Sequence, residues 1–418
     1  MGFGLIRTVI VILVVVLLYL SQKFWFRSLW RFSEQFTSPW TKVVRGAAIG
    51  ALGFLILFLA WRIFGHGIWQ RRAGISGTIV ALLQLWITSS LMAYVFFKTV
   101  RAVGWAWQRV RSVVGAKTAE DLRNADRRDF FRYAARFAAA VPIVAAVYGY
   151  AAERFDYRIR RVDIPVAHLP PALDGLTIAQ LSDIHIGDFM PRAEVRRGVD
   201  MANSLKADLA VITGDFLTGH NDPLADCIAE LSRLRAPLGV WGCNGNHEIY
   251  AEAEDEAQRL FALHGMKLLR QESATLEWHG ANVNLIGVDY QRDHMVRGPK
   301  PPMLAGIEPL IRRDMPNILL SHNPNSFNKA AELGIELSLA GHTHGGQVKV
   351  EILDEEVNPA RFITPFIAGL YQLPMRSADG SQSASKASLY VNRGLGTIGL
   401  PARLGVDPEI SLLTLRRA

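Results

Sequence analysis

The chain has 418 residues, half of them hydrophobic, and a formal net charge of +8. The charge is divided unevenly: residues 1–152 hold 19 Lys and Arg against 5 Asp and Glu, a net charge of +14, which leaves −6 for the remainder. A basic, strongly apolar N-terminal part indicates a membrane partner, and an acidic remainder lacks the basic face that nucleic-acid binding needs, so we expect no nucleic-acid partner.

Three apolar runs in the N-terminal part are long enough to cross a bilayer as helices: Phe3–Leu20, Gly46–Phe64 and Ile75–Phe97. A bilayer core takes about 20 helical residues, and aromatic residues cluster at the ends of these runs, as they do at membrane interfaces. Because two more spans follow the first run, we interpret it as an anchor and not as a cleaved signal peptide. Residues 1–152 are therefore predicted to be a membrane region with three to four transmembrane helices.

A fourth apolar run, Phe137–Ala152, is shorter and contains Pro142, and whether it crosses the membrane decides the topology. Residues 21–45 and 98–132 together carry 14 Lys and Arg, whereas the opposite set of loops carries 8. Loops rich in Lys and Arg stay in the cytoplasm. Four spans then place everything after about Glu153 outside, and three spans place it in the cytoplasm. We expect a multi-pass protein of the bacterial inner membrane with a periplasmic C-terminal part.

The C-terminal part alternates predicted strands and helices, a pattern typical of an α/β domain with helices outside a parallel or mixed sheet. Residues 153–175 contain a short strand, Val162–Val166, and three prolines, and are expected to link the two parts. The predicted strands are 176–181, 208–213, 239–243, 281–288, 318–321, 335–340, 389–392 and 409–415, and the predicted helices are 191–205, 224–234 and 253–264.

Five of the predicted strands end in residue types that bind metals, at the edge where open α/β sheets place their ligands. The residues are Asp183 and His185, Asp215, Asn246 with His247, His322, and the pair His342 and His344. Each motif alone has an ordinary explanation as a turn or a helix cap. The probability that all five motifs are only turns or helix caps is roughly a few per cent.

In this order the five motifs resemble the calcineurin-like metallophosphoesterases, whose pattern is Asp-x-His, Gly-Asp, Gly-Asn-His-Asp/Glu, His and Gly-His-x-His. Every position of that pattern is present between about Leu176 and the C-terminus. The resemblance implies a four-layer α/β/β/α sandwich over residues 176–418. The extension Gly345-Gly346-Gln347 and the tail from Asn392 to Arg403 are similar to a bacterial membrane-associated branch of phosphodiesterases, which includes relatives that cleave the pyrophosphate of UDP-diacylglucosamine.

The resemblance also implies two divalent metal ions. Position by position, it assigns the first ion to Asp183, His185, Asp215 and His344, and the second ion to Asp215, Asn246, His322 and His342. A bridging carboxylate such as Asp215 can hold two cations about 3.5–4 Å apart. Mixed nitrogen and oxygen ligands suit Mn, Fe, Zn or Co better than Mg or Ca, and we favour Mn.

The hypothesis for the reaction is in-line attack on phosphorus by a hydroxide that both metals activate. His247 is not a ligand in the family, and we expect it to protonate the leaving oxygen or to stabilise the transition state as imidazolium. Glu248 is expected to orient a histidine. Arg393 and Arg403 are candidates for binding substrate phosphate, and structural pairing with acids such as Glu409 explains them equally well.

Together these features predict a membrane-anchored phosphoesterase, a phosphodiesterase or pyrophosphatase, that acts on an envelope or lipid-linked phosphate ester. Protein phosphatases continue Gly-Asp with Asp-Arg-Gly, whereas here Phe216-Leu217-Thr218 follows, so that interpretation is disfavoured. A nuclease is disfavoured by the net charge of −6. The alternative from another class is a non-catalytic membrane protein that binds metal as a scaffold or sensor.

Overall fold

The computed structural model describes residues 2–64, 77–113, 125–291, 302–352, 355–362, 364–376 and 382–418. The chain divides into two compact units, Met1–Tyr148 and Gly149–Ala418. The division falls close to the boundary expected at residue 152, where the strongly apolar sequence ends.

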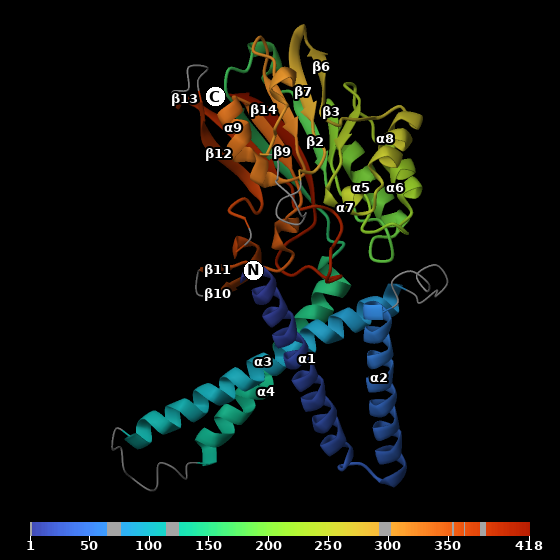
Figure 1. Cartoon of the computed structure of the whole chain (residues 1–418), viewed down its shortest axis with the longest axis vertical. Helices are drawn as coiled ribbons and strands as arrows, with labels where there is room; N and C mark the ends of the chain where they lie inside the picture. The colour runs from blue at the N-terminus through green and yellow to red at the C-terminus, as the bar shows by residue number, and fades with distance from the viewer. Residues whose placement is uncertain are drawn as a thin grey trace. The chain divides into compact units, whose positions relative to one another are not determined.

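The N-terminal unit is built from long helices (Figure 1), which are α1 (Gly2–Ser33), α2 (Ser38–Phe64), α3 (Gly77–Val113) and α4 (Ala125–Tyr148). In the described part of the chain, four segments are long and apolar enough to cross a membrane: Ile12–Ser33, Ser38–Phe58, Ile79–Trp107 and Phe130–Glu153. The fourth segment begins at Phe130 and continues through a π-helical turn, Gly149–Glu153. The apolar run that was doubtful from the sequence therefore has the length of a span.

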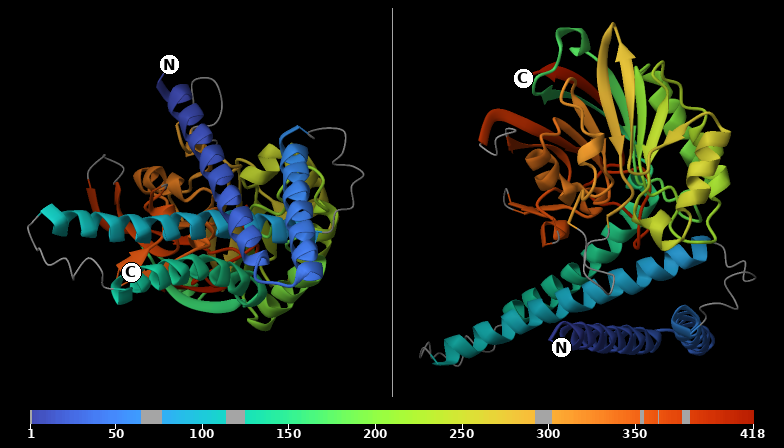
Figure 2. Two further views of the ribbon diagram at one scale, coloured as in Figure 1. Left: turned by 90° about the horizontal axis from the view of Figure 1, so that it is seen from below. Right: turned by 45° about the horizontal axis from the view of Figure 1, so that its top comes forward.

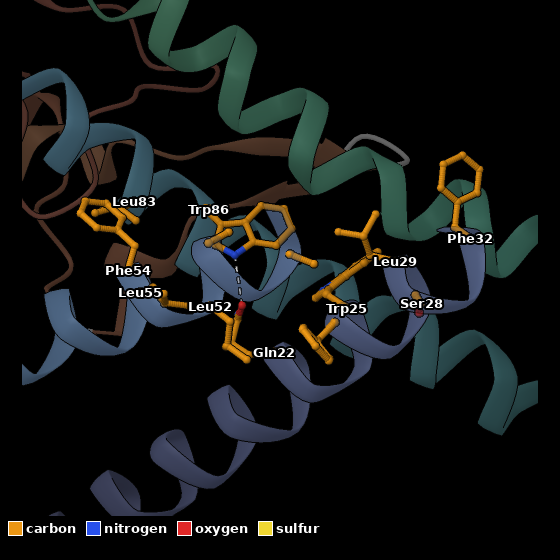
Figure 3. A pocket seen from close by; sticks show the side chains of 13 residues that line it. Gln22, Trp25, Ser28, Leu29, Phe32, Leu52, Phe54, Leu55, Leu83 and Trp86 are labelled. Carbon is orange, nitrogen blue, oxygen red and sulfur yellow. Dashed lines mark hydrogen bonds between the residues drawn. The ribbon is translucent and has the colours of Figure 1, made fainter. Parts of the chain in front are cut away.

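Polar side chains inside α1 find partners on α3. Ser21 Oγ and Trp25 Nε1 both donate to the carbonyl of Ser90, at 3.1 and 2.9 Å, and Gln22 Nε2 donates to Ser90 Oγ at 2.9 Å. Such partners are needed because the core of a bilayer offers none. Beside this cluster, α1, α2 and α3 surround a largely apolar pocket of about 600 Å³, where Trp86 Nε1 donates to Gln22 Oε1 (Figure 3).

The C-terminal unit contains two mixed sheets, which Figure 2 shows stacked face to face; in the described residues each has six strands. The order in the first sheet is β1 (Arg158–Val166), β14 (Glu409–Arg417), β2 (Thr177–Leu181), β3 (Leu209–Thr213), β4 (Val240–Cys243) and β5 (Lys267–Leu268). The order in the second is β12 (Gly369–Arg376), β13 (Gln382–Val391), β9 (Leu337–Ala340), β8 (Asn317–Leu320), β7 (Ala281–Gly287) and β6 (Glu272–Trp278). Strands β2 to β5 are parallel, and so are β7, β8, β9 and β13.

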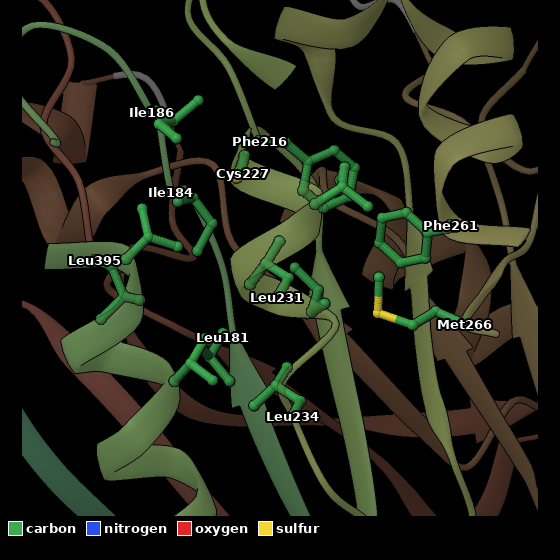
Figure 4. Close-up of a cluster of buried hydrophobic side chains, with 14 of the residues drawn as sticks. Leu181, Ile184, Ile186, Phe216, Cys227, Leu231, Leu234, Phe261, Met266 and Leu395 are labelled. Atoms are coloured by element: carbon green, nitrogen blue, oxygen red, sulfur yellow. The ribbon is translucent and has the colours of Figure 1, made fainter. Parts of the chain in front are cut away.

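Helices cover the outer faces of both sheets. The helices α5 (Arg192–Ser204), α6 (Leu224–Leu231) and α8 (Glu254–Leu263) pack on the first sheet, and α9 (Phe327–Leu333) packs on the second. Strand β3 shows why the layers form: Leu209 and Val211 join the core between the sheets, whereas Ala210 and Ile212 join the core under the helices. Figure 4 shows part of that second core, with Phe216 beside Phe261. The predicted four-layer α/β/β/α sandwich is confirmed.

The predicted strands and helices of the C-terminal part are present, most with small shifts at their ends, but the strand predicted at 389–392 is only the end of β13, which begins at Gln382. The segment expected as a linker does more than connect, because its strand is nine residues long and pairs in parallel with β14 over its whole length. The exposed Arg158 and Arg161 interrupt the hydrophobic pattern, so the sequence does not show the full length of this edge strand. Several elements were not predicted: the polar edge strand β6, the strands β5 and β12, the two-stranded sheet of β10 (Val350–Ile352) and β11 (Glu355–Val357), and the short helices α7 (Asn246–Tyr250) and α9.

Candidate metal centre

The seven predicted metal ligands lie shortly after the ends of strands of both sheets: five are in loops, Asn246 begins the short helix Asn246–Tyr250, and His344 begins a 3-10 turn. Strands β2, β3 and β4 of the first sheet lead into Asp183, His185, Asp215 and Asn246, and strands β8 and β9 of the second sheet lead into His322, His342 and His344. The residues are buried, apart from His342, which is half-buried. Parallel strands end at the same edge, so the two sheets bring these side chains to one place.

The first group of side chains consists of Asp183, His185 and His344. His344 Nε2 lies 3.1 Å from His185 Nε2 and 3.3 Å from Asp183 Oδ1. One ligand atom from each of the three lies within 4.8 Å of the others. This spacing suits side chains that converge on a single cation.

The second group consists of Asp215, His322 and His342, whose ligand atoms again lie within 4.8 Å of one another. Asp215 Oδ2 lies 3.2 Å from His322 Nε2 in this group and 3.4 Å from His185 Nε2 in the first. Asp215 therefore stands between the two groups, in the position that a bridging carboxylate needs.

Three polar atoms of the predicted ligands are buried without a hydrogen-bond partner: Asn246 Oδ1, His322 Nε2 and His344 Nδ1. Buried polar atoms are rarely left unsatisfied. The Nδ1–H of His322 donates to the carbonyl of Thr213 at 2.6 Å, so Nε2 is the nitrogen of His322 that faces the group. A divalent cation would satisfy Asn246 Oδ1 and His322 Nε2, and the mixed nitrogen and oxygen donors fit Mn, Fe, Zn or Co. The residues present therefore fit two metal ions.

Burial sets the protonation of the histidines. It lowers the pKa of His185 to about 3 and that of His342 to about 4, and it lowers the pKa of His344 well below its usual value. All three imidazoles are consequently neutral at pH 7, the form that binds metal.

The carboxylate of Asp215 supplies the negative charge. Burial by itself raises the pKa of Asp215, but the facing His322 and, to a smaller extent, His185 outweigh it, and the pKa lies well below the usual value. Burial by itself lowers the pKa of His322, but Asp215 and then Asp183 raise it to about 10. The field that favours positive charge on His322 also attracts cations to the same place.

Thr218 orients two histidines of the site. Its hydroxyl pairs with His185 Nδ1 at 3.1 Å, and its carbonyl accepts from His247 Nδ1 at 2.7 Å. The ring of His247 stands edge-on to that of His185, with centroids 4.8 Å apart. With Nδ1 engaged, Nε2 is the atom of His247 that can accept or release a proton.

Five of the ligands have left-handed backbone conformations, which are uncommon for residues other than glycine. Their φ angles are 50° for Asp183, 50° for His185, 55° for Asp215, 75° for His342 and 52° for His344. In a strand, an i and i+2 pair points to one face. These conformations instead bend the chain so that each pair wraps around the centre, and such strain persists where the surroundings enforce it.

Gly341 permits the close approach of the two sheets at the site. A Cβ atom there would lie 1.9 Å from Ser182 Oγ and 2.3 Å from Asp183 Oδ2, so no other residue fits without displacing a ligand. Next to it, the N–H of His342 donates to Asp183 Oδ1 at 3.0 Å. The loop that carries His342 and His344 is thereby docked on the loop of Asp183.

Glu248 has a different role from the expected one of orienting a histidine. It is fully buried, and its two carboxylate oxygens accept from the N–H groups of Asp215, Gly245, Phe216 and Leu217, at 2.9, 2.7, 2.8 and 3.4 Å. Its burial, followed by the nearby Asp215, raises its pKa to about 7. Glu248 therefore holds the backbone of the Asp215 loop against the loop of Asn246.

The two arginines proposed for substrate make structural contacts. Arg403 is fully buried, and its Nη2 donates to the carbonyls of Arg393, Gly394 and Gly396 at 2.8, 3.0 and 2.6 Å. Gly394 packs on the side chain of Asp183, so Arg403 stabilises the backbone against which this ligand lies. Because Arg403 is fully buried, it exposes no atom to a substrate. Arg393 forms an ion pair with Glu409, the structural alternative considered from the sequence.

Sequence reasoning missed two residues of the site. Thr218 lies in the motif after Asp215, but its role depends on contacts that no spacing shows. The ring of Tyr290 lies 5.4 Å from that of His342 and 6.0 Å from that of His322. Tyr290 follows β7, and the position of the ligands just after strand ends could therefore have indicated it as well.

The fold and the ligand arrangement define the class of this unit, and sequence comparison agrees. Residues 176–346 match the family model for calcineurin-like phosphoesterases. The C-terminal unit thus carries a domain of the calcineurin-like metallophosphoesterase superfamily.

Relatives of this chain include membrane proteins and bacterial proteins. It is 33% identical over 274 residues to a protein of Bos taurus named transmembrane protein with metallophosphoesterase domain. The aligned residues cover 62% of this chain and 57% of the bovine protein. It is 27% identical over 304 residues to the uncharacterized metallophosphoesterase YkuE of Bacillus subtilis, covering 71% of this chain and 99% of that protein. The chain spans about six tenths of the length of the bovine protein and of its namesake in Danio rerio.

Among solved structures, the NAD nucleotidase of Haemophilus influenzae is similar with a TM-score of 0.35 and 16% sequence identity, covering 53% of this chain and 45% of that one. The apolar helices and the transmembrane relative together indicate a membrane protein.

Proposed function

We propose that this protein is a membrane-anchored phosphoesterase that hydrolyses a phosphodiester or pyrophosphate bond with two divalent metal ions, manganese being favoured. The observation that carries the proposal is the convergence of six ligand side chains into two groups, with Asp215 of the second group 3.4 Å from His185 of the first. Asn246 Oδ1 completes the second group as a buried acceptor without a partner. A bridging carboxylate between two nitrogen-rich groups is the arrangement that two-metal hydrolysis uses.

The chain's own residues supply the rest of the chemistry. When bound, two divalent cations lower the pKa of a water molecule and neutralise charge on the phosphoryl oxygens. His247 is held by two contacts: its Nδ1–H donates to Thr218, and its backbone N–H donates to Asp215 Oδ1 at 3.0 Å. Its Nε2 is then fixed beside the metal groups, where it hands a proton to the leaving oxygen or bears positive charge in the transition state.

The substrate we propose is an envelope or lipid-linked phosphate ester, such as the pyrophosphate of a UDP-linked diacylglucosamine. The four candidate spans support this, because an active site tethered to a membrane meets lipid-linked substrates at a raised effective concentration. With all four spans crossing, the distribution of Lys and Arg puts the C-terminal unit in the periplasm of a bacterium. Reporter fusions placed after Ala152 test that orientation: activity of a cytoplasmic reporter there contradicts it.

The activity is tested on the full chain, purified in detergent, with bis(p-nitrophenyl) phosphate, its monoester and a UDP-linked lipid as substrates. His247→Ala should leave metal content unchanged and lower the rate by about 10²–10⁴-fold. His264→Ala is the matched control, because His264 is an exposed histidine at the end of α8. Full activity of His247→Ala contradicts its catalytic role. Two bound metals without hydrolysis of any substrate favour the scaffold or sensor alternative.

A further inference from the structure

The orientation of His247 depends on the loop between β3 and α6. Its Nδ1 donates to the carbonyl of Thr218, which lies on this loop, at 2.7 Å. Thr218 is exposed, and exposed loops are more mobile than the elements they connect. A carbonyl on such a loop can orient an imidazole only if other contacts hold the loop in place.

Asp222 supplies those contacts from within the same loop. Its Oδ2 accepts from the N–H groups of Thr218 and Gly219, at 2.8 Å each. The N–H of Asp222 in turn donates to the carbonyl of Gly219 at 3.0 Å. Hydrogen bonds to an ionised carboxylate are about twice as strong as those between neutral groups. The carboxylate therefore fixes the backbone on both sides of the Thr218 carbonyl.

The bond to Gly219 acts directly on the group that His247 uses. The Thr218 carbonyl and the Gly219 N–H belong to one peptide group, which is planar and trans. In a trans peptide these two groups point in opposite directions, so Asp222 on the N–H side sets the direction of the carbonyl toward His247. Gly219 contributes only its N–H, which any residue except proline supplies.

The carboxylate is also placed against the loop of the first metal group. A Cβ atom on Gly187 would lie 2.9 Å from Asp222 Oδ1, so the backbone two residues after the ligand His185 approaches the carboxylate closely. The two loops are joined beside this point by a β-bridge between Ile186 and Leu217. Asp222 therefore lies between the loop that carries His185 and the carbonyl that orients His247.

We propose that Asp222 is a positioning residue: through the peptide group of Thr218 and Gly219 it fixes the ring of His247 for proton transfer to the leaving oxygen. This inference rests on the proposed function of His247 in hydrolysis. Without the carboxylate the peptide group can rotate, and a displacement of about 1 Å in a reacting group can lower a rate by about 10²-fold. We expect Asp222→Ala to lower kcat by about 10–100-fold and to leave KM and metal content unchanged.

A double-mutant cycle tests whether Asp222 acts through His247. The rates of the full chain in detergent are measured with bis(p-nitrophenyl) phosphate for the wild type, Asp222→Ala, His247→Ala and the double variant. The double variant should be no slower than His247→Ala, because residues that act through one another are not additive. A further loss as large as that of Asp222→Ala by itself overturns the proposal. Asp226→Ala is the matched control, because Asp226 is a half-exposed acid on α6 that pairs with Arg192; an equal loss of rate in this control also overturns the proposal.

Two further measurements distinguish positioning from a general loss of structure. Diphenyl phosphate has a poorer leaving group than bis(p-nitrophenyl) phosphate, so its hydrolysis depends more on the proton from His247. The loss in Asp222→Ala should therefore be larger with diphenyl phosphate, whereas an equal loss with both substrates contradicts the proposal. Asp222→Asn keeps an oxygen for the two N–H groups and should retain a rate within about threefold of the wild type. A loss as large as that of Asp222→Ala would show that the charge, and not the hydrogen bonds, is what matters.

Hydrogen–deuterium exchange tests the loop without any turnover. The amides of Thr218 and Gly219 in the full chain should exchange about tenfold faster or more in Asp222→Ala, and at the wild-type rate in Asp226→Ala. Unchanged exchange in Asp222→Ala overturns the positioning role, whereas a wild type that binds two metals and hydrolyses none of the substrates overturns the proposed function. Exchange in β3 reports whether the fold is retained. Asp222→Ser, whose oxygen lies one bond closer to the backbone, repeats the tests if Asp222→Ala does not fold.

Discussion

The two sheets contribute to the metal centre in different ways. In the first sheet's half the Asp215 loop is held locally, because Glu248 binds its backbone within a stretch that ends soon after β4. The second sheet's half is held by distant chain: Thr343 Oγ1 donates to the carbonyl of Ile367, and Arg403 Nη1 donates to that of His344 at 3.4 Å. The Asp215 loop is therefore fixed by its own motifs, whereas Asp183 and the ligands of the second half also depend on segments outside the motifs, such as the N–H of Gly396 that donates to the carbonyl of Asp183 at 2.8 Å.

Substitutions in the segments that hold the two halves are therefore expected to have different effects. The segments that hold the second half include Ile367 and the tail around Arg393, and both residues also line a cavity of the C-terminal unit. A change in those segments is expected to move the loop that carries His342 and His344. A change near Glu248 alters the metal centre alone.

The largest effect is expected from Gly341→Ala, at the point where the two halves touch. The new Cβ would overlap Ser182 Oγ and Asp183 Oδ2, so the histidine loop has to move away from Asp183. We expect both ions to be lost and hydrolysis to fall by at least about 10²-fold, since ligands displaced by 1 Å no longer act together. Metal analysis and rate measurements check this. The control is Gly219→Ala, because a Cβ at Gly219 meets nothing within 4 Å; normal metal content in Gly341→Ala would show that the halves do not constrain each other.

Replacing either histidine of the second half, His342 or His344, is expected to have a smaller effect that is confined to one ion. His344 belongs with Asp183 and His185, whereas His342 belongs with Asp215 and His322. His344→Ala should therefore weaken the first ion, and His342→Ala the second, because each removes one nitrogen ligand. Metal stoichiometry at limiting metal concentration distinguishes the two variants. Loss of both ions to the same extent in each variant counts against the division.

Much of this site followed from the sequence because its ligands stand next to hydrophobic runs that end in metal-binding residue types. The contacts of Glu248 and Arg403 could not be predicted from the sequence, because their partners are backbone groups that come within reach only when the loops are folded. Glu248 lies next to a histidine in the sequence but binds N–H groups that begin at Asp215. Arg403 has the residue type of a phosphate ligand, and only its complete burial among carbonyl groups shows its structural role. Strand β1 was underestimated because an exposed edge strand has no continuous apolar pattern.

The smallest effect is expected from Glu248→Gln, which tests whether the first half is held locally. A glutamine keeps the shape but turns an NH2 group toward two of the four N–H donors, and leaving buried donors unsatisfied costs about 1–3 kcal/mol each. Because Asp215 serves both ions, their affinities should fall together, by about 10–100-fold, as is typical for groups that position ligands. Thermal unfolding and metal titration measure the two effects, with Glu256→Gln on the exposed face of α8 as the control. A loss of one ion alone would show that Glu248 acts on a single ligand and not on the shared Asp215 loop, and the contrast with His342→Ala and His344→Ala would then disappear.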